Sequence, residues 1–338
     1  MKNYLKYRVL LALFAVIAFG VYLFPLTTFA LTLTPVRFEI SGNPGDTLAG
    51  EILLINETET TEIYYSSFAN FEAQGETGSP SFVEPKDGLG TWIHAESASI
   101  TLGARQQKTV PFTIEIPKDA EPGGYFAVIF WGTSPPSGPG VSVGAKTGVL
   151  VLLSVPGEVR EDAGLVGFAT KDKNFFYNTL PIAFEYRFRN GGGDRVKPEG
   201  KIVIHNSVYW PTEKLDANAS VGNVLPNSTR KFSVDWVKYE RPESYVAPAG
   251  AWGKFWSAAG YQWRNFAVGL YVANLRLVYG SAGESAGDTV LFFVFPWQLV
   301  IVMIIVLAIL FFGGRWLIER YNRYIIEKAR ASAPSHGS

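Results

Sequence analysis

The sequence predicts an all-β fold of two tandem β-sandwiches followed by one C-terminal transmembrane α-helix. Three observations lead to this prediction. Short segments rich in apolar, β-branched and aromatic residues recur through most of the 338 residues, separated by Gly, Pro and Asn turns. A run without charge covers residues 292–312, about the length that crosses a bilayer as one helix. Basic residues follow this run, and others precede a second apolar stretch near the N-terminus.

Residues 1–30 have the layout of a secretory signal peptide. Lys2, Lys6 and Arg8 precede an apolar stretch from Val9 to Phe24, and Thr28-Phe29-Ala30 offers small residues at the spacing that a signal peptidase reads. The apolar stretch is long for a signal peptide, so an uncleaved N-terminal anchor is the alternative. Under both interpretations the chain from about residue 31 to residue 290 is exported.

The first predicted sandwich covers residues 31–156. In the segment from Val110 to Ile116 the apolar side chains occupy every second position, which is typical of a strand with one face in a core. Six further segments repeat at a spacing typical of sandwiches: Thr32 to Ile40, Leu48 to Asn56, Thr61 to Asn70, Ser97 to Leu102, Gly124 to Trp131 and Thr147 to Val155.

The second predicted sandwich covers residues 157–290, after a boundary at Val155-Pro156-Gly157-Glu158. Strand-like segments recur here as well, at Gly164 to Thr170, Leu180 to Asn190, Gly200 to His205, Arg230 to Val237 and Val268 to Gly280. An aromatic insert at residues 247–267 interrupts the series. About 260 exported residues are too many for one ordinary sandwich and suit two.

The aromatic insert contains the main candidate binding residues. Trp252, Phe255, Trp256 and Trp263 stand at i, i+3, i+4 and i+11, which predicts one face of a short helix near the membrane surface. The full candidate set is Trp252, Phe255, Trp256, Tyr261, Trp263 and Phe266. Such residues pack in a core, lie in the membrane interface, or bind a glycan or a protein partner, and the sequence leaves all three interpretations open. A second candidate is the stretch from Phe71 to Trp92, which reads as a long, acidic, Gly-rich loop.

The C-terminal region predicts a single membrane span at residues 292–312 and a basic cytoplasmic tail at 313–338. Pro296 and Trp297 suit the point where the chain enters the membrane. A buried core helix is the alternative, although such helices seldom run this long without charge. The basic residues of the tail place the C-terminus inside the cell and most of the chain outside: Arg315, Arg320, Arg323, Lys328 and Arg330.

Composition excludes several classes of function. The chain has no cysteine, so it has no disulfide and no thiolate or zinc–cysteine chemistry. The segment predicted to be exported carries 22 basic and 28 acidic residues, a net charge of about −6 that does not favour nucleic-acid binding. His94, His205 and His336 form no metal-ligand or catalytic motif. We therefore expect no enzyme, cofactor or metal, although paired carboxylates could in principle hydrolyse a glycoside.

Several motifs resemble one family of bacterial surface proteins. The start of the first sandwich contains Leu33-Thr34-Pro35-Val36-Arg37-Phe38 and Ile55-Asn56-Glu57-Thr58, and its end contains Pro117-Lys118-Asp119-Ala120-Glu121-Pro122-Gly123-Gly124-Tyr125. The second contains Phe188-Arg189-Asn190 and Leu225-Pro226-Asn227-Ser228. In this order they resemble the WxL-interacting protein family. The resemblance implies a signal peptide, two immunoglobulin-like domains, a membrane helix and a short basic tail. It also implies peptidoglycan as a ligand of the first domain and host or partner proteins as ligands of the second.

Two functions follow as hypotheses. The preferred one is a non-enzymatic, membrane-anchored bacterial surface protein that binds peptidoglycan or another exported protein through its two sandwiches. The alternative is an accessory or sensory subunit of a membrane complex, whose basic tail from Arg315 to Arg330 contacts a cytoplasmic partner. A tail of about 25 residues is too short for a signalling domain, which favours the first hypothesis.

Overall fold

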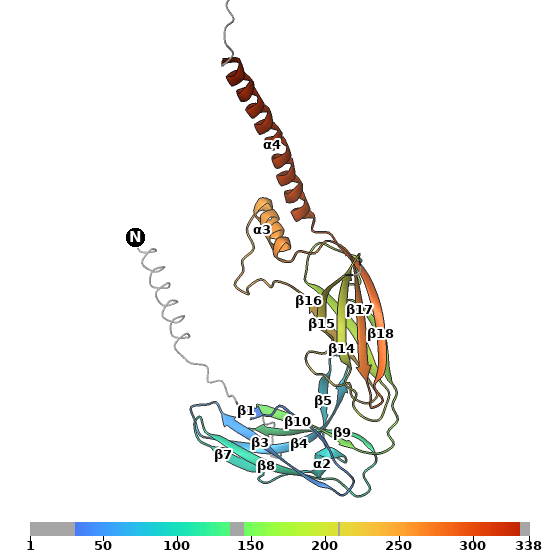
Figure 1. The fold of residues 1–338 in the computed structure, drawn as a ribbon. Coiled ribbons are helices and arrows are strands. Elements are labelled where there is room, and N and C mark those ends of the chain that lie inside the picture. Colours follow the sequence, from blue (N-terminus) through green and yellow to red (C-terminus); the bar gives the residue numbers. More distant parts are fainter. Residues whose placement is uncertain (1–30, 136–144, 209, 332–338) are drawn as a thin grey trace, which may run out of the picture. The chain divides into compact units, whose positions relative to one another are not determined.

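A computed structural model describes residues 31–135, 145–208 and 210–331 of the chain (Figure 1). The predicted signal peptide at 1–30 lies outside the described residues. The chain divides into two compact units. The first contains the residues up to Gln74 and those from Pro80 to Arg160, and the second contains Gly75–Ser79 and the residues from Glu161 onward. Strands dominate both units, so the all-β prediction is confirmed, and the division falls a few residues after the predicted boundary.

The first unit is a sandwich of two sheets. One sheet has the order β1-β3-β8-β6 and the other the order β2-β10-β9-β4-β5, with β7 also paired to β4. The segment from Thr32 to Ile40 was predicted as one strand but belongs to two, one in each sheet, with Pro35 between them. The strands are β1 (Leu31–Thr34), β2 (Arg37–Ser41), β3 (Thr47–Asn56), β4 (Glu62–Gln74), β5 (Ser79–Val83), β6 (Ile93–Ala95), β7 (Ser99–Leu102), β8 (Gln107–Glu115), β9 (Gly123–Gly132) and β10 (Lys146–Val155).

A buried asparagine closes one end of this sandwich. Asn56, the last residue of β3, is fully buried. Its Nδ2 donates hydrogen bonds to the carbonyls of Thr60 (2.8 Å) and Gly103 (2.9 Å), and its Oδ1 accepts from the N–H of Thr58 (3.0 Å) and the hydroxyl of Tyr64 (3.0 Å). Because a buried amide is stable only when it is hydrogen-bonded, these partners fix the turn after β3.

The second unit is also a sandwich. A sheet of order β11-β13-β16 faces a sheet of order β12-β18-β17-β14-β15. The buried Asn190 at the end of β13 has the role of Asn56, with Nδ2 donating to the carbonyls of Asp194 (2.7 Å) and Val224 (2.9 Å). The strands are β11 (Ala163–Thr170), β12 (Phe176–Tyr177), β13 (Ile182–Asn190), β14 (Glu199–Asn206), β15 (Pro211–Asp216), β16 (Ser228–Trp236), β17 (Gly269–Tyr279) and β18 (Glu284–Val294).

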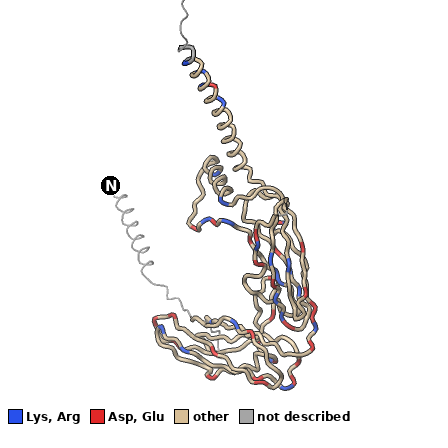
Figure 2. Tube along the Cα trace, viewed as in Figure 1, with Lys and Arg blue, Asp and Glu red and all other residues tan. Residues whose placement is uncertain are grey.

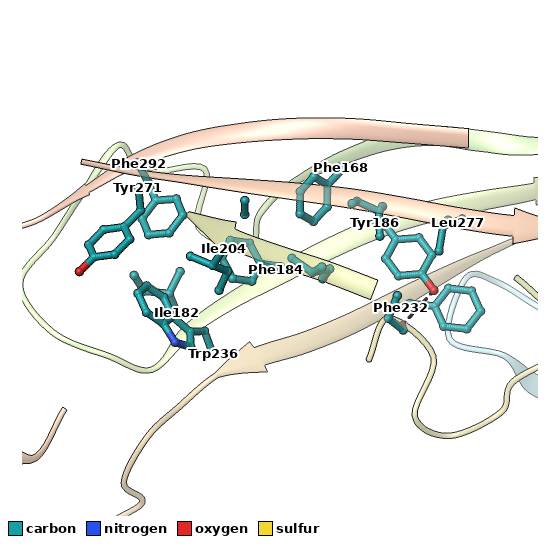
Figure 3. Close-up of a cluster of buried hydrophobic side chains, with 14 of the residues drawn as sticks. Phe168, Ile182, Phe184, Tyr186, Ile204, Phe232, Trp236, Tyr271, Leu277 and Phe292 are labelled. Atoms are coloured by element: carbon teal, nitrogen blue, oxygen red, sulfur yellow. Dashed lines mark hydrogen bonds between the residues drawn. The ribbon is translucent and has the colours of Figure 1, made fainter. Parts of the chain in front are cut away.

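Aromatic side chains fill the core of the second unit (Figure 3). Tyr186 stacks on Phe232 with ring centroids 4.8 Å apart, and its hydroxyl donates a hydrogen bond to the carbonyl of Ala217 (3.0 Å). Trp236 is fully buried and meets Tyr271 edge to face at 5.1 Å. Burial raises the pKa of Tyr186 well above its usual range.

Two helices belong to the C-terminal half of this unit. They are α3 (Ala251–Arg264), between β16 and β17, and α4 (Trp297–Ala331), directly after β18. The helix α4 is long and apolar enough to cross a membrane from Trp297 to Ile326. Figure 2 shows that its first half carries no charged residue and that its charges gather toward its C-terminal end.

The predicted span, 292–312, begins too early, and its helix continues past the predicted end. Phe292 and Val294 are fully buried in β18, where they pair with Tyr271 and Gly269. The apolar run therefore joins the end of a core strand to the start of a helix, and Pro296 separates them. At the other end the helix continues to Ala331, so most of the predicted tail is helical.

The predicted loop from Phe71 to Trp92 is also corrected. β4 extends to Gln74 and β5 begins at Ser79, so most of the stretch is a β-hairpin followed by the short helix α2 (Leu89–Trp92). Phe71 is buried against Phe126, with ring centroids 5.9 Å apart. Gly75, Glu76 and Gly78 belong to the turn of this hairpin, while Glu84, Asp87 and Gly88 lie between β5 and α2.

Candidate membrane-interface site

The aromatic insert contains the short helix that its spacing predicts, and a buried asparagine holds the end of this helix. Asn265, which follows α3, is almost fully buried. Its Oδ1 accepts hydrogen bonds from the N–H groups of Lys238 (3.3 Å) and Tyr239 (3.0 Å), and its Nδ2 donates to the carbonyl of Tyr239 (3.0 Å). The N–H of Asn265 donates to the carbonyl of Tyr261 (3.0 Å). These bonds join the two ends of the insert where it leaves β16 and enters β17.

A glutamine connects α3 to the first turn of α4. Gln262 is 2% exposed. Its Nε2 donates hydrogen bonds to the carbonyl of Asn178 (3.1 Å) and to Oε1 of Gln298, and its Oε1 accepts from the N–H of Leu299 (2.9 Å). The first N–H groups of a helix have no partner within the helix, so Gln262 caps α4 from outside. The two helices are therefore held together where α4 begins (Figure 1).

Arginine–tyrosine contacts join α3 to the segment between β16 and α3. The guanidinium of Arg241 lies over the rings of Tyr245 (4.4 Å) and Tyr261 (4.2 Å). Arg264 lies over Tyr239 at 4.7 Å. These distances are within the range of cation–π interactions. Tyr261, one of the six candidates, is thus a half-buried packing residue of the insert.

The three tryptophan side chains of α3 are exposed. Trp252, Trp256 and Trp263 are 73%, 47% and 67% exposed. Phe255 is half-buried and meets Trp252 at 6.1 Å, Trp256 at 5.7 Å and Trp297 of α4 at 6.0 Å. The structure therefore groups Trp252, Phe255 and Trp256 with Trp297 beside the start of α4, as their spacing predicts. We call Trp252, Trp256 and Trp263 the indole face.

Phe266 lies outside this group. It follows α3, is 44% exposed, and its carbonyl accepts a hydrogen bond from Nζ of Lys238 (2.7 Å). The sequence does not indicate the role of Gln262 in joining α3 to α4, because a single glutamine among aromatic residues matches no recognisable motif.

An apolar groove runs between α3 and α4. Its volume is about 490 Å³. One wall consists of Trp256, Ala259, Gly260 and Trp263, and the other of Leu299, Val302, Met303, Val306 and Leu307. The residues of the second wall stand at i, i+3, i+4, i+7 and i+8, which places them on one face of α4.

Charge around the two helices is uneven. α3 contains Lys254 and Arg264 and no acidic residue. The predicted topology-determining residues lie toward the C-terminal end of α4. Arg315 pairs with Glu319 (2.9 Å), and Arg320 lies over Trp316 (5.2 Å). Nε of Arg323 donates to the carbonyl of Glu319, and Lys328 and Arg330 occupy the last turns of the helix.

A second candidate surface lies at an open edge of the first unit. β1 pairs with β3 only along Leu53 to Asn56, and within the described residues no ladder forms with Thr47 to Ile52 on that side. Beside this edge is a hollow of about 230 Å³, lined by apolar residues of β2, β3 and β8 that include Phe38, Leu48 and Phe112. An edge of this kind offers unpaired backbone N–H and C=O groups to another strand.

The histidines and carboxylates of the described residues form no cluster that suits a metal ion. No group of three or more His, Asp or Glu side chains in this part of the chain could hold a metal ion. His205 is half-buried, with Nδ1 3.1 Å from Nδ2 of Asn274, while His94 is exposed on β6. The two lie in different units, and His336 is outside the described residues.

No protein-family model matches this sequence, and no curated protein matches it. Among solved structures it is similar to the chaperone–tip adhesin complex of CFA/I fimbriae, at 11% identity and a TM-score of 0.36 over 78% of this chain and 98% of that one. It is also similar to the class 5 fimbrial chaperone CfaA, at 12% identity and a TM-score of 0.36 over 78% of this chain and 99% of that one. The CsuC–CsuE chaperone–tip complex of Acinetobacter baumannii is similar at 11% identity, with a TM-score of 0.35 over 78% of this chain and 99% of that one.

Proposed function

We propose that this chain is a membrane-anchored, non-enzymatic exported protein whose immunoglobulin-like sandwiches bind another exported protein. The helix α4 is the observation that carries the proposal. It is long and apolar enough to span a bilayer, its side chains from Ile304 to Phe312 are mostly exposed, and it directly follows the last strand of a sandwich. A helix that is apolar on all sides is stable only in an apolar surrounding.

The charges of α4 support one orientation. Arg315, Arg320 and Arg323 follow the uncharged part of the helix, and basic residues that flank a span stay on the cytoplasmic side. Both sandwiches then lie outside the cell. Phe255 contacts Trp297 as well as the indole-face residues Trp252 and Trp256, so these rings gather at the other end of the span, where aromatic residues favour the interface between water and lipid.

The open edge of β3 supports a protein partner rather than a polysaccharide. An extended polypeptide can continue the sheet through main-chain hydrogen bonds, and its apolar side chains can enter the hollow beside Phe38 and Phe112. A glycan has no regular row of N–H and C=O groups to match this edge. We therefore favour an exported protein as the partner over peptidoglycan.

Crosslinking on intact cells tests this proposal. A lysine at Ala49, an exposed position of the open edge, should block the addition of a strand. Ala49→Lys should therefore abolish crosslinked protein adducts. The control is Thr113→Lys, because Thr113 is the cross-strand neighbour of Ala49 but lies between β3 and β6. Equal adducts for both variants and for the unaltered chain would exclude the edge as the binding surface.

The motif resemblance suggests the class of partner. If the chain is a relative of the WxL-interacting proteins, neighbouring genes should encode exported proteins with a C-terminal WxL motif. Inspection of the genome around this gene tests the suggestion, and neighbours without any such protein would count against it.

A further inference from the structure

The groove between α3 and α4 has no role in the protein–protein function proposed above. It lies where the predicted span begins, and its lining is apolar on both walls. From Leu299 to Leu307 it follows α4 for about 12 Å at 1.5 Å per residue. If α4 spans the membrane, this length lies in the outer part of the bilayer, so the surrounding medium is lipid.

The size of the groove suits a small molecule or a single extended chain. Its volume of about 490 Å³ lies within the roughly 300–1,000 Å³ range of small-molecule sites. Ala259 and Gly260 form a notch between Trp256 and Trp263, and a Cβ built at Gly260 would meet no atom within 4 Å.

The charge of α3 favours an occupant with an anionic head. α3 contains Lys254 and Arg264 and no carboxylate, although neither basic residue lines the groove itself. Phospholipids combine an acyl chain with a phosphate group, and phosphates are attracted to Lys and Arg near the membrane surface.

We propose that the α3–α4 groove is a binding site for one acyl chain of a bilayer phospholipid. The chain lies along Leu299 to Leu307, and the notch at Gly260 receives it between two indole rings. The hydrogen bonds of Gln262 keep the groove open by holding α3 beside the first turn of α4. This inference rests on the membrane anchoring in the proposed function.

Native mass spectrometry of the full chain, extracted from membranes in mild detergent, tests the site. We expect the unaltered chain to retain one phospholipid. Gly260→Phe should place a ring in the notch, where a Cβ meets no atom within 4 Å, and lower the lipid-bound fraction by about tenfold, which corresponds to about 1.4 kcal/mol. Gly260→Ala adds only a methyl group and should retain the lipid.

Gly313→Phe is the matched control, because Gly313 also has open space around its Cβ but lies farther along α4 and does not line the groove. It should retain the lipid. Equal lipid retention by Gly260→Phe and the unaltered chain would overturn the site, as would bare chain in every sample. A second protein in place of the lipid would also overturn it. An unaltered chain that is absent from the membrane fraction would instead refute the proposed function itself.

Discussion

Replacing Gln262 with alanine should release α3 from α4 while both sandwiches stay folded. The side chain makes three hydrogen bonds, two donated by Nε2 and one accepted by Oε1 from the N–H of Leu299. Each such bond contributes about 0.5–1.5 kcal/mol, so their sum is about 3 kcal/mol. That loss raises the equilibrium constant for opening of α3 by roughly 100-fold.

Hydrogen exchange of the full chain in detergent or in a bilayer disc measures this opening directly. The amides of α3 should lose about two orders of magnitude of protection, and those of β17 and β18 should be unchanged, because local opening exposes only the released segment. Gln298→Ala is the control, since it removes one of the three bonds and should cost only about 1 kcal/mol. Unchanged protection of α3 in Gln262→Ala would refute the view that this side chain docks the helix.

Three further predictions concern the sandwiches and the indole face. The double replacement of Trp252 and Trp256 by alanine should leave the thermal unfolding midpoint of the full chain unchanged and weaken its binding to liposomes. Trp236→Ala should instead lower the free energy of unfolding by about 3–5 kcal/mol, because only Trp236 is in the core. A large loss of stability in the double variant would make the indole face part of the core. The pKa of Tyr186 is raised in the folded state, so the unfolded chain releases this proton first as the pH rises. The free energy of unfolding should therefore fall above the ordinary pKa of 10.0. In an alkaline denaturation series, Tyr186→Phe should flatten that fall. An equal slope in both proteins would count against the assignment. Asn56→Ala should destabilise the first unit by about 2–4 kcal/mol in denaturant titrations, since it removes the amide that bonds the carbonyls of Thr60 and Gly103 and the buried hydroxyl of Tyr64. A change below about 0.5 kcal/mol would mean that water replaces the amide.

The strands were the most predictable part of the fold. In β8 the alternation of Val110, Phe112 and Ile114 reflects a periodicity that depends only on neighbouring residues, and all three are buried as predicted. The division of the first segment into β1 and β2 was missed. It depends on pairing with β3 in one sheet and with β10 in the other, and β10 is more than a hundred residues away.

The start of the membrane helix was misplaced for a related reason. A buried core strand and a membrane helix are equally apolar, so hydropathy alone cannot separate Phe292 and Val294 from the residues after Pro296. The proline was the local signal for the boundary. Its importance becomes clear only when β18 is seen paired with β17.

The candidate site was predictable in its aromatic residues and not in its polar ones. Spacing along a helix places Trp252, Phe255 and Trp256 together, and they do meet. The contacts of Gln262 involve residues 36, 37 and 84 positions away, and the sequence around Gln262 contains no trace of them. Long-range polar contacts of this kind require the fold.

The central claim is that α4 spans a membrane with both sandwiches outside the cell. Because the chain has no cysteine, single cysteines report its topology without background. We predict that a membrane-impermeant maleimide labels Ala104→Cys on intact cells and labels Ser338→Cys only after permeabilisation, while both variants stay with the membranes in an alkaline wash. Labelling of Ser338→Cys on intact cells, or release of the chain by the wash, would contradict the account.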